Sequence, residues 1–222
     1  MIRWTTNLPL IFAALAALQT LSLAQLTFTD LPGAGEDRVA ITSMVEQGII
    51  RPVSPTRFDP DGFITREDFA VALTKMFGLS PLEKRISFPD VPTNSAVYPF
   101  VEAAAPYMNR QILCFGCALG RNFLPAESVS DAELTISLTS VLLAKKKVEF
   151  VSGDTAIEQM AEVVGGNDLP PAAKLYFAIA IRNGIVSGEK PIQLKRKATR
   201  ADVAVQLYSV QKKFEFPQLR GP

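Results

Sequence analysis

The chain has 222 residues, enough for one or two domains, and its 23 basic side chains nearly balance its 22 acidic ones. This balance argues against a nucleic-acid binder, which usually needs a basic surface. The sequence contains no histidine, which excludes Ser-His-Asp and Cys-His catalysis and His-zinc sites. No paired-acid spacing indicates a carboxylate-based hydrolase, so we expect no enzymatic activity, no metal and no cofactor.

The first 24 residues have the pattern of a signal peptide. Arg3 precedes a short apolar run at residues 8–21, and the small residues Ser22 and Ala24 mark a cleavage site before Gln25. An uncleaved membrane anchor is the alternative, but the run is short for a span of about 20 residues. We therefore expect an exported mature chain without a membrane span.

A helix is expected early in the chain, at residues 37–47, directly before Gly48. A similar helix at residues 171–183 precedes Gly184, and glycine just past the last turn is the usual C′ residue. Between them, residues 95–110 read as a helix with a kink at Pro106. Residues 154–164 indicate an additional helix that has no counterpart in the rest of the chain.

Each of the three upstream helices is followed by a loop and a second helix that begins at a cap. In these caps a Ser or Thr precedes an acid by three residues, at Thr65/Asp68, Ser130/Glu133 and Thr199/Asp202. Apolar residues at helical spacing follow each cap and predict one buried face. A large apolar residue also lies seven positions before each cap, at Phe58, Phe123 and Ile192. The pattern therefore occurs three times, with caps separated by 65 and 69 residues.

Taken together, these motifs resemble the S-layer homology (SLH) domain. The resemblance is carried by the Phe-x-Asp openings at residues 28–30 and 88–90, the Gly-Ile-Ile and Gly-Ile-Val runs, and ITREDF at residues 64–69. It implies a mainly α fold, with three tandem helix-loop-helix repeats packed pseudo-threefold around a central three-helix bundle. We expect a signal peptide at 1–24, repeats at 25–80, 86–147 (degenerate) and 148–213, and an irregular tail at 214–222.

The resemblance also implies a function and a site. SLH domains bind cell-wall polysaccharide noncovalently, typically an anionic, pyruvylated polymer linked to peptidoglycan, in grooves between repeats. It predicts that Arg66 and Arg200 contact this ligand, and we count Thr65, Thr199, Gly48 and Gly184 among the ligand-binding residues as well. The protein would then be an exported, non-catalytic protein of the cell envelope or cell surface, with an oligomeric state that the sequence leaves open.

The residues themselves favour the same site. Arg66 and Arg200 occupy the first helical position, where a cation is unfavourable for the helix. An anionic ligand would account for them, because guanidinium groups bind carboxylates in a two-point geometry. The alternative is that both arginines pair with nearby acids on the surface. Asp131 takes this position in the second repeat, which predicts a poor anion site there and at most two competent grooves.

Two shorter motifs allow other readings. Cys114 and Cys117 form a C-x-x-C pair, which in an exported chain indicates a local disulfide rather than a reactive redox pair.

Residues 58–69, FDPDGFITREDF, resemble a calcium loop in their aspartates and glycine. However, Arg57 replaces the first ligand and the short Asp68 takes the closing position. We therefore read this stretch as a turn before a capped helix.

A second function remains open from the sequence. The chain could be a protein–protein interaction scaffold that kept the SLH fold and lost polysaccharide binding. The altered second repeat favours this alternative, as does the absence of tryptophan after Trp4.

Overall fold

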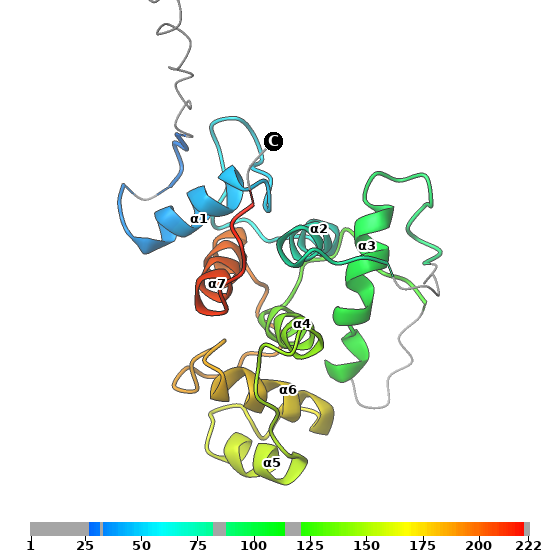
Figure 1. Ribbon diagram of the computed structural model, residues 1–222, viewed down its shortest axis with the longest axis vertical. Coiled ribbons are helices and arrows are strands. Elements are labelled where there is room, and N and C mark those ends of the chain that lie inside the picture. Colours follow the sequence, from blue (N-terminus) through cyan, green and yellow to red (C-terminus); the bar gives the residue numbers. More distant parts are fainter. Residues whose placement is uncertain (1–26, 32, 82–87, 114–120, 220–222) are drawn as a thin grey trace, which may run out of the picture.

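The structure is a computed structural model, and it describes residues 27–31, 33–81, 88–113 and 121–219 (Figure 1). The expected signal peptide and the pair Cys114 and Cys117 lie outside these residues. Over the described residues the fold is mainly α, with α-helices and isolated β-bridges but no strands. The helices are α1 (Glu36–Glu46), α2 (Arg66–Phe77), α3 (Tyr98–Ala104), α4 (Asp131–Ala144), α5 (Gly153–Ala161), α6 (Pro171–Arg182) and α7 (Arg200–Lys213), with 3₁₀ turns at Ala105–Tyr107 and Arg110–Leu113. In the same residues, none of these helices combines the length and apolar character needed to span a bilayer.

The helices α2, α4 and α7 begin at the predicted caps. The Thr65 hydroxyl accepts the N–H of Asp68 at 3.2 Å. At α4, the Glu133 N–H donates to the Ser130 hydroxyl, and the Ser130 N–H donates back to the Glu133 carboxylate, both at 3.2 Å. Thr199 forms the same reciprocal pair with the third residue of its helix. Local sequence therefore sets the start of each of these helices.

The upstream helices were predicted with unequal success. Gly48 and Gly184 follow α1 and α6 with φ of 65° and 60°, in the left-handed region that glycine adopts without strain. The prediction of one kinked helix at residues 95–110 is wrong in extent, because α3 ends at Ala104. Pro106 has no N–H to donate to an earlier carbonyl, and the chain continues as a 3₁₀ turn.

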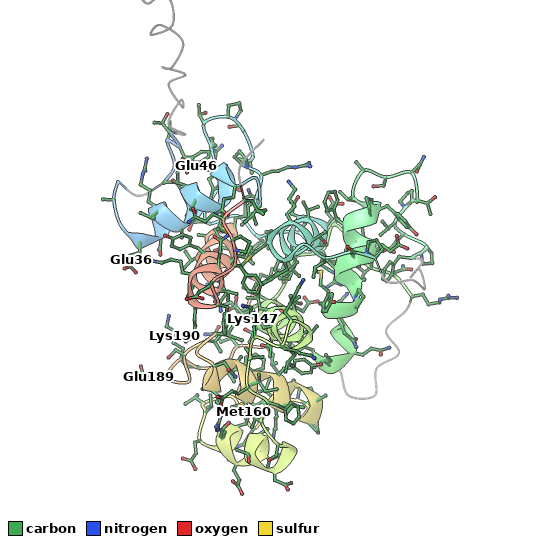
Figure 2. All side chains as sticks on the ribbon, viewed as in Figure 1. Glu36, Glu46, Lys147, Met160, Glu189 and Lys190 are labelled. Carbon is green, nitrogen blue, oxygen red and sulfur yellow. The ribbon has the colours of Figure 1, made fainter. Side chains whose placement is uncertain are left out.

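The outer helices pack on the capped helices of other segments. Figure 1 shows α2, α4 and α7 nearly end on in the middle, with α1, α3 and α6 around them. The helix α1 packs on α7, α3 packs on α2, and α6 packs on α4. Side chains from all three capped helices, such as Phe69, Leu138 and Leu207, enter one buried cluster. A second cluster lies between α4, α5 and α6 and includes the fully buried Met160 of α5 (Figure 2).

The chain segments that precede the three capped helices are joined by backbone hydrogen bonds. The Ile64 N–H donates to the Ala198 carbonyl at 3.3 Å, and the Ala198 N–H donates to the Val129 carbonyl at 2.9 Å. The Val129 N–H completes the ring by donating to the Ile64 carbonyl at 3.1 Å. All three side chains are fully buried. This ring holds the N-termini of α2, α4 and α7 close together.

Candidate functional site

Arg66 opens α2 and reaches the segment that precedes α4. Its Nε donates to the Phe123 carbonyl at 2.7 Å, and its guanidinium lies 4.8 Å from the centre of the Phe123 ring. A second nitrogen donates to the Glu133 carboxylate. Only 2% of the arginine is exposed, and this desolvation lowers its pKa, although Glu133 opposes the shift. Arg66 therefore joins α2 to the loop and cap of α4.

Arg200 makes the corresponding contacts at the start of α7. Its Nε donates to the Phe58 carbonyl at 2.8 Å, and its guanidinium lies 4.9 Å from the Phe58 ring centre. A further nitrogen donates to the Arg51 carbonyl. Arg200 is 6% exposed, and desolvation lowers its pKa. Both arginines thus have contacts within the fold that the sequence did not reveal, because those partners come from distant parts of the chain.

We call the place where the start of one capped helix meets the loop before another capped helix a junction. The junction at Asp131 has an acid where the junctions at Arg66 and Arg200 have an arginine. Here the cation is Arg196, which lies in the loop before α7. It donates to the Asp131 carboxylate at 2.6 Å and to the Asp202 carboxylate at 3.0 Å. Burial raises the pKa of Asp131 even though the hydrogen bond from Arg196 opposes it. The apolar residue of this junction is Ile192, which offers no aromatic ring for a guanidinium. A carboxylate that is already bound to an internal cation leaves little for an anionic ligand to contact.

The three junctions contain pockets of very different size. The largest has a volume of about 530 Å³ and is lined by Arg66, Phe88, Met108, Asn109, Arg110, Gln111 and Phe123. We call it the Arg66 groove. The pocket at Asp131 has about 160 Å³, and the pocket at Arg200 has about 20 Å³. Of these three junction pockets, the Arg66 groove alone falls in the range of about 300–1,000 Å³ that is common for small-molecule sites. Elsewhere in the described residues, a pocket of about 860 Å³ between α1 and α7 and one of about 370 Å³ beside Arg110 fall in the same range.

The predicted ligand-binding residues are distributed over different junctions. Gly48 leads into residues 49–51, which border the small pocket at Arg200. Gly184 leads into Val186, which borders the pocket at Asp131. Arg66 has no such glycine beside it, since the corresponding segment is residues 111–113. The hydroxyls of Thr65 and Thr199, in turn, accept hydrogen bonds from their own helices.

The sequence interpretation missed the polar residues of the Arg66 groove. Arg110 lies 3.2 Å from Glu127 and 3.7 Å from Glu133, and its side chain remains 31% exposed. Asn109 and Gln111 beside it are exposed. The sequence offered one indication of them, namely their position. They occupy the place that the C′ glycines Gly48 and Gly184 take in the other two segments.

The Phe-x-Asp openings fix the loops that receive the arginines. The Asp90 carboxylate accepts the N–H groups of Phe123 at 2.9 Å and Leu124 at 2.7 Å. Asp30 holds the loop at Phe58 in the same way, with distances of 3.0 and 2.7 Å. The residue after each phenylalanine has a φ of 61°, a strained value for a non-glycine residue. The two carboxylates therefore stabilise the strained loops and position the carbonyls that Arg66 and Arg200 contact.

Metal ligands do not gather in the described residues. No group of three or more Asp, Glu, His or Cys side chains there has the spacing to hold a metal ion. The stretch that resembles a calcium loop serves instead to lead into α2, and Thr65 within it is the helix cap.

These features define a mainly α protein with paired helices and, where two segments meet, a groove with arginine and amide side chains among its apolar lining. Residues 27–70 match the family model of the S-layer homology domain. No curated protein matches the chain. An SLH domain indicates a cell-envelope protein that is anchored through a cell-wall polymer, and the matched residues include Arg66 and the loop that Asp30 holds.

Proposed function

We propose that this protein is a non-catalytic cell-envelope protein that binds an anionic, pyruvylated wall polysaccharide through three SLH repeats. The repeats would be residues 25–80, 86–147 and 148–213, arranged with pseudo-threefold symmetry around α2, α4 and α7. The ring of hydrogen bonds through Ile64, Val129 and Ala198 supports this arrangement. The packing of each outer helix on the capped helix of another repeat supports it as well.

The observation that carries the proposal is the combination of cations and space in the Arg66 groove. Arg110 presents a guanidinium there that remains 31% exposed although Glu127 and Glu133 lie beside it, and the buried Arg66, which is paired with Glu133, lines the same groove. A carboxylate of the polymer would bind between them, and the amides of Asn109 and Gln111 would bind sugar hydroxyls. The hydrogen bonds between a guanidinium and a carboxylate are charge-assisted and are therefore stronger than hydrogen bonds between neutral groups.

The other junctions are poorer sites. Arg200, with Thr199 and Gly48 nearby, keeps the predicted residue types, but its pocket is too small for a sugar ring without rearrangement. Gly184 leads toward Asp131, whose carboxylate is held by Arg196. We therefore propose one competent groove, at Arg66.

A pull-down on purified cell-wall sacculi, with and without polymer-stripping treatment, tests the function. The informative variant is Gln111→Glu, which places a negative charge at an exposed position of the groove. Repulsion at close range should weaken binding about tenfold. Gln218→Glu is the matched control, because it makes the same change at an exposed position outside the groove. Retention of both variants at wild-type level would contradict the assignment of the groove.

A protein–protein scaffold remains the second candidate function. The ion network of Asp131, Arg196 and Asp202 favours it, because it closes one junction with internal charges. Under this alternative, stripping the polymer from the sacculi would leave retention of the protein unchanged.

A further inference from the structure

We propose that the polymer site continues from the Arg66 groove into a second, cationic pocket on the far side of Arg110. This pocket has a volume of about 370 Å³ and is lined by Arg110, Leu113, Ser128, Ser130, Glu133, Leu194, Lys195 and Lys197. We call it the lysine pocket. Its ligand would be a further anionic residue of the same polysaccharide chain, so the inference rests on the proposed function.

The charges of the lysine pocket are not balanced from within. Lys195 and Lys197 are exposed, and in the described part of the chain neither forms an ion pair. Glu133 is the pocket's one carboxylate among the lining residues, and both of its oxygens are engaged. One accepts from Arg66, and the other accepts the Ser130 N–H at 3.2 Å. Two ammonium groups are therefore left to attract an anion.

The segment that carries the two lysines is held in place. The Arg196 carbonyl accepts the Asp131 N–H at 2.9 Å, and the Arg196 side chain binds two carboxylates. The Lys197 backbone forms a β-bridge with Ser130, and its Nζ lies 5.3 Å from the centre of the Phe63 ring. A ligand would therefore order two side chains but no backbone, which keeps the entropic cost of binding low.

Arg110 lies between the two pockets. It lines both the Arg66 groove and the lysine pocket, and Ser128 and Ser130 line the lysine pocket with it. A chain that carries a charge on successive residues could contact Arg66 and Arg110 with one unit and the lysines with another. The second contact would be intramolecular once the first had formed, so affinity should increase with chain length.

The test uses wall polymer released from sacculi by enzymatic digestion of the peptidoglycan, which leaves acid-labile pyruvate ketals intact, and separated into short and long fragments. We expect the wild-type protein to bind long fragments more tightly than short ones. Lys195→Gln/Lys197→Gln should lose about tenfold in affinity for long fragments, since each exposed ion pair contributes little, and should bind short fragments unchanged. It should also show a shallower dependence of affinity on salt.

The matched control is Lys145→Gln/Lys146→Gln, which removes two exposed lysines at the opposite end of α4. That end lies about 20 Å from the Ser130 cap, given the rise of a helix. Thermal melts of all three proteins should coincide. Wild-type affinity of Lys195→Gln/Lys197→Gln for long fragments would overturn the extended site alone. Failure of the wild-type protein to bind sacculi or either fragment would overturn the proposed function together with it.

Discussion

The loop that receives Arg66 depends on one carboxylate, and this makes Asp90 the most informative residue for stability. Asp90 accepts the N–H groups of Phe123 and Leu124, and Phe123 is almost fully buried. Asp90→Ala would leave these donors without their acceptor and would release a loop in which Leu124 has a positive φ. The same loop forms a wall of the Arg66 groove.

The expected cost of Asp90→Ala follows from two charge-assisted hydrogen bonds. Each contributes about 1.5–3 kcal/mol, and we take the lower value because Asp90 is only half-buried. The free energy of unfolding should therefore fall by about 3 kcal/mol. For a chain of this size that change lowers the melting temperature by about 6–12 °C. Urea unfolding and calorimetry measure both quantities, and sacculus binding should weaken as the groove wall loosens.

The control for Asp90→Ala is Asp61→Ala, which removes an exposed aspartate from the turn before α2. Because surface substitutions away from specific contacts cost little, its free energy of unfolding should stay within about 0.5 kcal/mol of wild type. Equal stability of the two variants would refute the role of Asp90 as the residue that fixes the loop.

Three further predictions concern buried charge, pH and backbone conformation. Arg66→Met should lower the free energy of unfolding, measured in urea, by about 3 kcal/mol, because the Glu133 carboxylate loses the cation that pairs with it. Arg66→Met/Glu133→Gln should recover part of this loss while keeping the helix cap. Burial raises the pKa of Asp30, but the amides of Phe58 and the next residue outweigh it and hold that pKa below 3.8. The stability from Asp30 is therefore complete above about pH 3.8 and is lost as the pH falls through the lowered pKa. The free energies of unfolding of wild type and Asp30→Asn should consequently converge at low pH. Gly184→Ala should cost about 1–2 kcal/mol, measured by thermal melts, because φ is 60° there.

The elements that the sequence predicted correctly are those set by short-range chemistry. A cap needs only a hydroxyl and an acid three residues later, so the starts of α2, α4 and α7 followed from Thr65, Ser130 and Thr199. The C′ glycines depend on φ at one residue and were equally visible. The middle helix was mispredicted because Pro106 ended it rather than bending it, and this choice depends on what the following residues pack against.

The site could be predicted only in part, because its contacts join residues far apart in the chain. The bond from Arg66 to Glu133 spans 67 residues, and the bond from Arg200 to Phe58 spans 142. No local pattern encodes such partners, so the arginines suggested an external anion before their internal contacts were known. The groove at Arg110 was not predicted for the same reason, since it forms where α3 packs on α2 and the following 3₁₀ turns pack on α4 and α6.

The junctions can differ in charge because their charged side chains are not the only groups that hold them together. The ring through Ile64, Val129 and Ala198 uses backbone groups and buried apolar residues, so it tolerates either sign of charge at the first helical residue. At the Asp131 junction the first helical residue is an acid that pairs with Arg196, whereas Arg66 is a cation that pairs with Glu133. An arginine at position 131 would meet Arg196, and the two like charges would repel each other. Asp131→Arg alone would therefore not restore an arginine-type junction, and Arg196 would have to change with it.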